Sequence, residues 1–518
     1  MSERAGFTRR QVVGGAAVAA AAAVLPQSPA EAARRRRRSS HADPTADVVI
    51  VGGGLSGLAA ARAVAKSGRA PLVLEARHRV GGRTLNHPIG GGKIVEAGGQ
   101  WLGPTQDRAY ALCRELGLST YPTYIDGNHI YAFDGTRMTY TESGPTGTAP
   151  PDPVALPDIV QVIQRLDAMA QEVPVDRPWT AKQAGDWDQQ TLETWLRQNS
   201  ATERFRKLAR FAVRSIFGAE PSEMSLLFAL SEMAAAGNEQ NVGTFERLFS
   251  TRGGSNQDRI HGGSQLIALG LARELGDRVM LGRPVRRISQ TSSGVTVDAD
   301  GLSVHAQRAI VAIPPALAGQ IVYEPLLPAS RDQLTRRIPQ GTQIKCEAMY
   351  ERPFWRDTGY SGFAITDLGP GQVVFDNSPP DGTPGVLVSF VCGENARAWS
   401  TRLPDLRDAI VKQYGELWGP EALKPADWFQ MFWAGEEWSR GCPVGVVPPG
   451  VLIDNGPALR EPVGRIHWAG TETSTYWNGY MEGAIRAGER AAAEALADLR
   501  APAATRRVAR RAHHRRRR

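Results

Sequence analysis

The chain is 518 residues long, too long for one hydrophobic core, so we expect at least two domains. Its formal net charge of +8 comes from the two ends. Residues 1–42 carry eight Arg against two Glu, and residues 499–518 carry nine Arg and no acid. The rest of the chain is mildly acidic, which argues against a nucleic-acid-binding surface on that part. The four cysteines are far apart in the sequence, a distribution that favours neither a metal site nor a disulfide framework.

The N-terminus has the pattern of an export signal. Arg9 and Arg10 precede an apolar Ala/Val stretch, and Ala30-Glu31-Ala32 has the small-x-small form of a cleavage site. We therefore expect residues 1–32 to be a signal peptide of the twin-arginine type, residues 33–46 to be a basic linker, and the protein to be secreted or attached to the cell envelope. An uncleaved anchor is the alternative. No apolar run in the body is long enough to cross a bilayer, so we expect no transmembrane helix after signal removal.

The segment from Asp47 to Glu75 predicts a dinucleotide-binding unit. A β-branched run suits a buried parallel strand, and Gly52, Gly54 and Gly57 follow it in the G-x-G-x-x-G spacing. These glycines allow a tight turn, close approach of the backbone to a pyrophosphate, and close packing of the Ala-rich helix that follows. The free N–H groups and dipole of that helix would face the diphosphate. After a second short strand, Glu75 is placed to accept hydrogen bonds from a ribose hydroxyl.

Beyond this strand, Gly81-Gly82-Arg83 can bring a backbone and a fixed cation to the same phosphates. The region resembles the FAD-dependent amine oxidase family, the monoamine and polyamine oxidases, in the stretches GGGLSGLAAARAVAKSG and LEARHRVGGRT. The segment from Gly98 to Gln106 is also similar to that family and by resemblance lies over the flavin. Near the C-terminus, the stretches RIHWAGTET and WNGYMEGAIRAGERAA closely resemble the family's closing cofactor motif. The resemblance therefore extends to Leu499.

Between the first motifs and residue 255 the sequence differs in character. Loops rich in Pro and Gly lead into segments in which apolar residues recur every three or four positions, the pattern of amphipathic helices. These segments are Ile159–Gln171, Thr191–Asn199, Glu203–Phe217 and Met224–Ala236. We expect a mostly helical insertion that covers the cofactor domain.

The second half of the chain returns to strands. A helix over Leu266–Leu275 is followed by strand-like Val279–Leu281, Val285–Ile288, Gly294–Ala299 and Ala309–Ala312. Residues 342–433 alternate between apolar and polar, with strands at Thr342–Tyr350, Val386–Val391 and Trp428–Trp433 and a helix at Leu403–Trp418. This second group predicts an antiparallel sheet with a helix, placed as the floor of a substrate cavity.

These elements predict an α/β fold of the two-domain α+β kind. A Rossmann-like FAD-binding domain is expected from the discontinuous segments 47–124, 256–334 and 434–498. A substrate-binding domain of antiparallel sheet and helices is expected from 125–255 and 335–433, and 499–518 is expected to be a disordered Arg-rich tail.

The resemblance implies further contacts with FAD. In the family, a residue at the position of Val285 contacts adenine through its backbone, and the helix that begins at Met481 would place partial positive charge near flavin N1. The residues that we expect to bind FAD are Gly52, Gly54, Leu55, Ser56, Gly57, Glu75, Ala76, Arg77, Gly82, Arg83, Thr84, Gly99, Gln100, Trp101, Val285, Cys442, Gly470, Glu472, Tyr480 and Met481.

The resemblance also implies catalytic roles. Lys345 aligns with the lysine that holds a water against flavin N5, and Tyr480 aligns with one wall of the aromatic cage around the amine nitrogen. Trp477 is a weaker catalytic candidate.

Cys442 aligns with the cysteine that carries the flavin through a thioether in monoamine oxidases, although some relatives lack it and bind FAD without a covalent bond. Pro443 stands where animal monoamine oxidases have the second cage tyrosine, which favours a wider slot that admits aliphatic amines. The alternatives are an ordinary strand-edge lysine, packed aromatic side chains and a buried free cysteine.

We therefore predict an FAD-dependent amine oxidase that passes hydride from the amine α-carbon to flavin N5 and yields an imine or aldehyde, ammonia and hydrogen peroxide. The expected partners are a small-molecule amine and oxygen, and a homodimer is compatible with the sequence. Two alternatives stay open: an L-amino acid oxidase, for which no carboxylate-binding arginine is assignable, and a flavoprotein that docks to anionic envelope polymers through its Arg-rich ends. An NAD dehydrogenase is disfavoured by Gly81-Gly82-Arg83 and by the C-terminal motif.

Overall fold

The computed structural model describes residues 44–144 and 146–500. The described residues from Thr45 onward group as one compact unit. The signal peptide, most of the linker and nearly all of the Arg-rich tail lie outside the described residues, and those expectations stay predictions, as does the division of the body into two domains. Within the described ranges, no helix combines the length and the apolar character that a membrane span requires.

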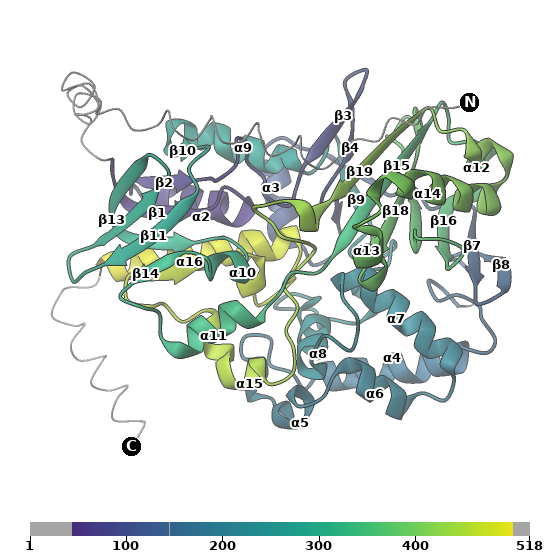
Figure 1. Cartoon of the computed structure of the whole chain (residues 1–518), viewed down its shortest axis with the longest axis horizontal. Coiled ribbons are helices and arrows are strands. Elements are labelled where there is room, and N and C mark those ends of the chain that lie inside the picture. The colour runs from purple at the N-terminus through teal and green to yellow at the C-terminus, as the bar shows by residue number, and fades with distance from the viewer. Residues whose placement is uncertain (1–43, 145, 501–518) are drawn as a thin grey trace, which may run out of the picture. The chain divides into compact units, whose positions relative to one another are not determined.

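An eight-stranded sheet gathers segments from both ends of the chain (Figure 1). Its order is β10-β2-β1-β13-β12-β11-β14, with β20 paired to β13. Strands β10, β2, β1, β13 and β20 run parallel to one another, as expected for a Rossmann-like unit, whereas β12 is antiparallel to β13. The strands are β1 (Thr45–Val51), β2 (Pro71–Leu74), β10 (Val279–Met280), β11 (Val285–Gln290), β12 (Val295–Ala299), β13 (Leu302–Val311), β14 (Val322–Glu324) and β20 (Ile466–Trp468).

Two Ala-rich helices pack on this sheet and on each other. In β1, Val48 and Ile50 join the core formed with helices α2 and α16, while the alternate residues face a second core. A Cβ atom added at Gly488 of α16 would lie 2.1 Å from the backbone oxygen of Ser56 in α2, so the two helix backbones touch. The helices of this core are α2 (Leu55–Lys66), α3 (Asp107–Glu115), α9 (Gln265–Leu275) and α16 (Met481–Arg500). Helix α10 (Pro315–Ala318) contributes to the second core, and α11 (Ala329–Arg337) and α15 (Val451–Asn455) contribute to a third.

A second sheet has seven strands in the order β19-β15-β18-β17-β16-β7-β8. Its pairs are antiparallel except β7 with β16, which are parallel. Every residue of β15 is buried, because both faces of the sheet are covered. The strands are β7 (Asn128–Phe133), β8 (Thr136–Tyr140), β15 (Gln343–Tyr350), β16 (Tyr360–Thr366), β17 (Val373–Asp376), β18 (Gly385–Cys392) and β19 (Asp427–Phe432).

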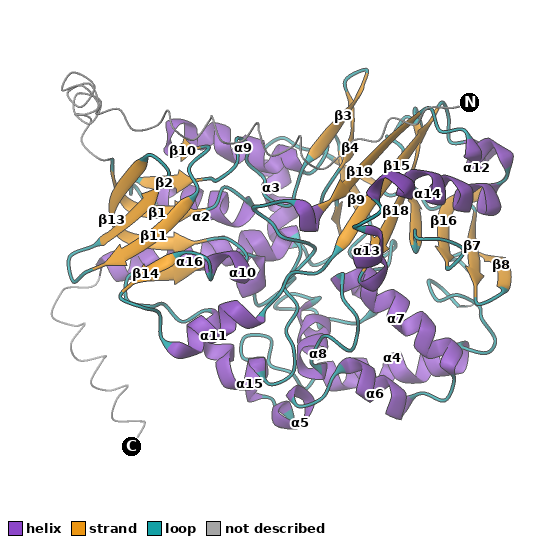
Figure 2. Ribbon diagram, in the orientation of Figure 1, coloured by secondary structure: helices purple, strands orange, loops and turns teal. Residues whose placement is uncertain are grey.

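Helices cover both faces of the seven-stranded sheet (Figure 2). One core joins β15 and β18 to α14, and another joins Tyr131, Phe133 and Tyr140 of the β7–β8 hairpin to helices α4–α8. The helices are α4 (Leu156–Ala170), α5 (Ala184–Asp188), α6 (Leu192–Asn199), α7 (Glu203–Phe217), α8 (Leu226–Ala235), α12 (Phe354–Asp357), α13 (Glu394–Trp399) and α14 (Leu403–Trp418). Short strands complete the fold: β3 (Asn86–Gly90) pairs with β4 (Lys93–Glu96), and β5 (Trp101–Leu102) and β6 (Thr120–Pro122) pair with β9 (Asp258–Ile260).

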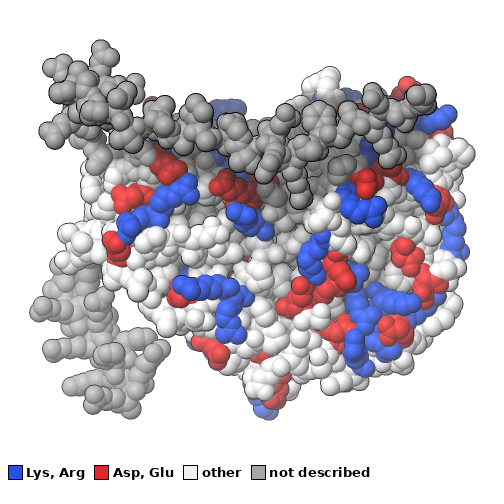
Figure 3. Space-filling view, viewed as in Figure 1, with Lys and Arg blue, Asp and Glu red and all other residues white. Residues whose placement is uncertain are grey.

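The expectation of a mostly helical segment from 120 to 255 was incomplete. The segment contains the β7–β8 hairpin, whose two-residue turn is Asp134-Gly135 with φ of +50° and +75°. A D-G pair between strand-forming residues is a strong hairpin signal, and it was overlooked in favour of the helical periodicity that follows. On the face shown in Figure 3, Lys and Arg alternate with Asp and Glu over the described residues.

Candidate active site

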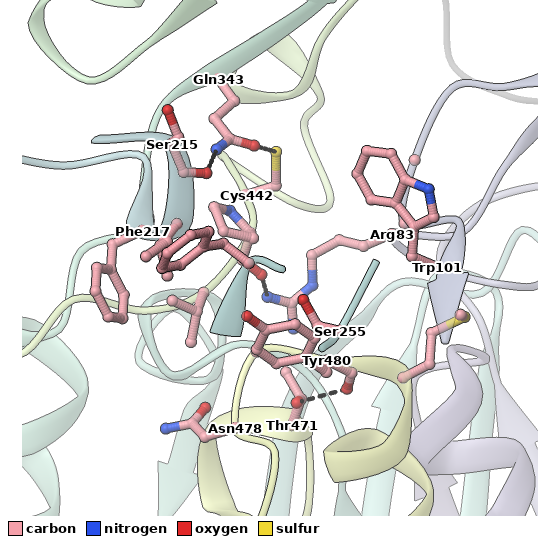
Figure 4. Close-up of a pocket in the computed structure, with 18 of the residues that line it drawn as sticks. Arg83, Trp101, Ser215, Phe217, Ser255, Gln343, Cys442, Thr471, Asn478 and Tyr480 are labelled. Atoms are coloured by element: carbon pink, nitrogen blue, oxygen red, sulfur yellow. Dashed lines mark hydrogen bonds between the residues drawn. The ribbon is translucent and has the colours of Figure 1, made fainter. Parts of the chain in front are cut away.

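One continuous cavity of about 560 Å³ extends from the glycine-rich loop after β1 to the helices under the seven-stranded sheet. Most of the residues expected to bind FAD line it: Gly52, Gly54, Leu55, Ser56, Glu75, Ala76, Arg77, Gly82, Arg83, Thr84, Gly99, Gln100, Trp101, Val285, Cys442, Gly470, Tyr480 and Met481. The catalytic candidate Lys345 lines it as well. The structure thus brings residues from both ends of the chain to one space (Figure 4).

Gly57, Glu472 and Trp477 lie behind this lining. A Cβ atom at Gly57 would come within 1.9 Å of the Gly52 backbone oxygen, so Gly57 allows the helix to pack against the turn. The carboxylate of Glu472 holds a neighbouring arginine, as described below. The Trp477 side chain is 1 % exposed, and its Nε1 donates to Thr105 Oγ1 at 3.1 Å. Any direct role of these three residues toward cofactor or substrate stays a prediction.

The glycine-rich loop forms a backbone cradle that can hold a diphosphate. We call it the glycine cradle, and it consists of Gly54 at the start of α2 and the facing Gly82. Gly54 is the N-cap of α2 and has extended backbone angles, and no side chain caps the free N–H groups of the first turn. Gly82 has a φ of +60°, and a Cβ atom there would lie 3.3 Å from the Gly54 Cα. Two glycine backbones therefore face each other beside open helix N–H groups, an arrangement that fits the pyrophosphate of FAD.

Glu75 ends β2 next to this cradle and is oriented by the backbone. Its Oε2 accepts from the Gly53 N–H at 2.6 Å and its Oε1 from the Arg77 N–H at 2.9 Å. Each carboxylate oxygen has a second lone pair, so the side chain can also accept from a ribose hydroxyl. The Arg77 guanidinium is itself fixed, because it donates to Ser439 Oγ at 2.8 Å.

Arg83 joins the first motif of the chain to the last. Its guanidinium donates to both carboxylate oxygens of Glu472, at 2.6 and 3.1 Å, and to the backbone oxygen of Pro443 at 2.7 Å. Burial opposes ionisation of the Glu472 carboxyl, but the charge of Arg83 and the hydrogen bonds that the carboxylate accepts together outweigh burial and hold the pKa below its usual value. This bidentate pair fixes the loop that carries Cys442 against the glycine cradle.

Lys345 on β15 is buried, with 3 % of the residue exposed. Its Nζ donates to the backbone oxygens of Glu96 and Gly98 and to Gln100 Oε1, and it lies 3.5 Å from Glu347 Oε1. Burial lowers the pKa of the ammonium, while the nearby carboxylates oppose that shift. The position of the amine is thus set by protein acceptors, and its proton is held less tightly than in water.

A buried charged cluster supports Lys345, and the sequence analysis did not single it out. Arg259 Nη2 donates to Glu96 Oε2 at 2.7 Å, and Asn377 Nδ2 donates to Glu347 Oε2 at 3.0 Å. Burial raises the pKa of the Glu347 carboxyl. Of these residues only Glu347 lies in a predicted strand, and Glu96 and Arg259 are 163 residues apart, so no local pattern joins them.

Tyr480 presents its ring to the cavity from the turn that precedes α16. Its hydroxyl donates to the Leu248 backbone oxygen at 2.8 Å, and its ring meets the Trp477 ring edge-on at 4.9 Å. Nearby, Asn478 Nδ2 donates to Glu232 Oε1 at 2.7 Å. Burial raises the pKa of the Glu232 carboxyl to about 8. Sequence analysis missed Glu232 because it lies within an otherwise apolar helical segment.

Cys442 is buried and its thiol faces Gln343, with Sγ 3.8 Å from Gln343 Oε1 (Figure 4). Burial raises the pKa of this thiol to about 12. The next residue, Pro443, lines the cavity without an aromatic ring. A different wall is aromatic: the Trp101 ring lies 5.0 Å from that of Phe375 and 5.8 Å from that of Phe390.

The chain has known relatives over most of its length. Residues 55–496 match the family described as flavin containing amine oxidoreductase. The chain is 42 % identical over 457 residues to the putative flavin-containing monoamine oxidase AofH of Mycobacterium tuberculosis, covering 88 % of this chain and 97 % of the relative. It is 40 % identical over 460 residues to amine oxidase [flavin-containing] B of Sus scrofa, covering 87 % and 86 %.

Two solved structures are similar. Cyclohexylamine oxidase from Brevibacterium oxydans has a TM-score of 0.83 at 35 % identity, over 88 % of this chain and all of that chain. Wild-type putrescine oxidase bound to putrescine has a TM-score of 0.82 at 34 % identity, over 88 % and 99 %. These findings confirm the predicted fold class and the FAD cofactor. The chain belongs to the flavin containing amine oxidoreductase family and is an FAD-dependent oxidoreductase that acts on amines.

Proposed function

We propose that the protein oxidises a primary or secondary amine at its α-carbon to an imine, which water converts to an aldehyde and ammonia or a smaller amine, while oxygen is reduced to hydrogen peroxide. The observation that carries the proposal is that the glycine cradle, Lys345 and Tyr480 all line one cavity. When bound, FAD supplies the acceptor, at N5, for the hydride that leaves the amine α-carbon.

The cavity wall prepares the amine. Apolar and aromatic side chains such as Phe375 and Phe390 disfavour an ammonium, so the bound substrate gives up a proton more easily than in water. The Tyr480 ring, fixed through its hydroxyl, flanks the nitrogen and limits its orientation. Because Pro443 offers no second cage ring, this side of the slot accepts aliphatic as well as aromatic amines.

Two charged features act during turnover. Lys345 holds a proton beside the cavity, where its lowered pKa suits proton transfer when oxygen is reduced. The N-terminus of α16, which starts at Met481 on the cavity wall, places partial positive charge where negative charge develops. Both groups come from regular elements, a fully buried inner strand and a 20-residue helix.

A peroxide assay on the purified, FAD-loaded protein tests the proposal. We expect oxygen-dependent formation of peroxide from alkylamines or arylalkylamines, with one aldehyde formed for each peroxide. We expect turnover of free amino acids to be at least about tenfold slower, because no arginine in the described lining is free to bind a carboxylate. A protein that keeps its flavin but oxidises none of a panel of monoamines, diamines and polyamines would contradict the proposal. Faster turnover of amino acids would favour an L-amino acid oxidase.

We further propose that the flavin is bound covalently through Cys442. In acid precipitation, the wild-type protein is expected to keep its yellow colour in the pellet, and Cys442→Ala to release it to the supernatant. Cys113→Ala is the matched control, since Cys113 is also buried but lies outside the described cavity lining, and its pellet is expected to stay yellow. A wild-type pellet without colour would show that FAD is held by non-covalent contacts alone.

The proposed location is outside the cytoplasm, supported by Arg9, Arg10 and the apolar stretch that follows them. Because the twin-arginine route moves folded proteins, it is compatible with a flavoprotein that binds FAD before export. Replacing both arginines with lysine is expected to keep the protein inside the cell while purified enzyme activity is unchanged.

A further inference from the structure

Glu347 lies behind Lys345, away from the cavity. Both residues belong to β15, and because side chains alternate along a strand they share one face of it. Glu347 is 0 % exposed and is not among the described lining residues, whereas Lys345 is. The Oε1 of Glu347 lies 3.5 Å from the Lys345 Nζ, an ion-pair distance, and has no other partner among the described residues. This carboxylate oxygen therefore faces Lys345 alone.

The acceptors around the Lys345 Nζ determine its charge. Nζ donates to the backbone oxygens of Glu96 and Gly98 and to the Oε1 of Gln100. An ammonium has three N–H groups, and a neutral amine has two. All three acceptors are thus satisfied only when Lys345 is an ammonium, so the surrounding structure requires the charged form.

Two amide side chains connect Lys345 to Glu347. Because Lys345 only donates, Gln100 faces it with Oε1 and turns its Nε2 to the Oδ1 of Asn377 at 2.7 Å. The Asn377 Nδ2 then donates to the Glu347 Oε2 at 3.0 Å. Together with the ion pair between Glu347 and Lys345, these contacts close a ring. We call this set, Lys345, Gln100, Asn377 and Glu347, the polar ring.

The buried charges at the polar ring balance. Arg259 Nη2 donates to Glu96 Oε2 at 2.7 Å, and this pair is buried and neutralises itself. Glu347 is then the carboxylate that balances Lys345, and it opposes the burial that lowers the pKa of the ammonium more strongly than Glu96 does. On the opposite face of β15, burial raises the pKa values of two further groups and keeps them neutral: Cys346 and Tyr414.

We propose that Glu347 is a positioning residue for the reduction of oxygen, because it keeps Lys345 in the ammonium form and holds it at the cavity wall. This inference rests on the proposed function and concerns its second half. Oxygen becomes hydrogen peroxide by taking two electrons and one proton from the anionic reduced flavin and one proton from the solvent. Negative charge develops on oxygen before both protons have arrived, and a fixed ammonium beside the cavity stabilises it.

The test separates the two half-reactions of the FAD-loaded full chain in wild type and Glu347→Gln. Mixing with an amine without oxygen gives the rate of flavin reduction, which we expect to stay within about twofold of wild type. Mixing the reduced enzyme with oxygen at a series of pH values gives the rate of reoxidation. That rate should fall as pH rises through the pKa of Lys345. The midpoint of the fall should lie about one to three pH units lower in Glu347→Gln, because the opposite charge beside the ammonium is lost.

Further variants show whether Glu347 acts through Lys345. Lys345→Met is expected to reoxidise roughly a hundredfold more slowly, without the pH-dependent fall. Combining it with Glu347→Gln should cause no additional loss, because the two residues act as a unit. Glu347→Asp keeps the charge and should keep the midpoint near that of wild type. Asp188→Asn is the matched control: Asp188 in α5 is also 0 % exposed but lies outside the described lining, and its midpoint should equal that of wild type.

Urea unfolding detects the same proton without turnover. When the native pKa of a lysine is below its unfolded value, the unfolded chain binds more protons between the two values, and the free energy of unfolding rises with pH. The contribution of Lys345 is isolated by subtracting the free energy of unfolding of the corresponding Lys345→Met variant. We expect this rise to begin at a lower pH on the Glu347→Gln background than on the wild-type background.

The outcomes distinguish this inference from the proposed function. Equal midpoints in wild type and Glu347→Gln, no fall in either protein, or additional loss in the double variant would overturn the role of Glu347 and leave amine oxidation intact. Reoxidation of Lys345→Met at the wild-type rate would do the same. Failure of any amine to reduce the flavin of the wild-type protein would instead overturn the proposed function, and the role of Glu347 with it.

Discussion

Gly57→Ala is expected to yield a protein that binds little or no flavin. The new Cβ atom would lie 1.9 Å from the Gly52 backbone oxygen and 3.2 Å from Ile50 Cγ2. Neither the strand nor the first turn of α2 can move without displacing the glycine cradle, and a clash of this kind destabilises by roughly 4 kcal/mol or more. The measurement is the flavin-to-protein absorbance ratio after purification, with Tm in the presence of excess FAD.

Gly185→Ala is the matched control for that substitution. A Cβ atom at Gly185 in α5 meets no atom of the described residues within 4 Å, and the backbone there does not have a positive φ. We expect full flavin content and a Tm equal to or slightly above wild type, because alanine restricts the unfolded chain. Stoichiometric flavin and an unchanged Tm in Gly57→Ala would show that the contact with Gly52 does not limit the fold.

Glu232→Gln is expected to stabilise the protein, and more so as pH rises. The carboxyl of Glu232 has a pKa of about 8 in the fold against 4.5 ordinarily, because it is buried. Between those values the unfolded chain is ionised while the native chain keeps its proton, so native stability falls by about 1.4 kcal/mol per pH unit. The loss is absent below pH 4.5 and reaches about 5 kcal/mol above pH 8, and glutamine avoids it.

Urea unfolding at pH 5, 7 and 9 with equal flavin loading measures this difference. The free energy of unfolding of Glu232→Gln minus that of wild type should be small at pH 5 and grow toward pH 9. Glu416→Gln, an exposed carboxyl on α14, should show a difference near zero throughout. A difference for Glu232→Gln that does not change with pH would mean that this carboxyl is ionised in the native protein.

Local patterns predicted much of the fold. The bounds of α7 and α14 agree with the helical periodicity at both ends, because each has a continuous apolar stripe to bury. The signals that predict β1, the glycine-rich turn and α2 are equally local, because the strand, the turn and the helix each have their own pattern in the sequence. The predicted FAD-binding residues lie mostly on one cavity because the family motifs at both ends of the chain are strong.

What escaped prediction depends on contacts distant in sequence. The parallel pairing of β7 with β16 joins Ile130 to Ala364, and no local pattern identifies that partner. The cavity residues His129 and Tyr140 are of the same kind, because they look like ordinary strand residues until the cavity is known. The Arg259–Glu96 contact likewise could not be derived from two isolated charges. The motifs thus predicted residues that line the cavity, and the side chains that shape the rest of the cavity escaped prediction.

The Arg83–Glu472–Pro443 contacts have a consequence for biosynthesis. During translation the glycine cradle leaves the ribosome several hundred residues before Glu472 and α16, which complete the same pocket. A nascent chain that has not yet emerged as far as Glu472 therefore has only half of its prosthetic-group site. Stable flavin uptake needs both halves, so we expect it to follow the synthesis of α16.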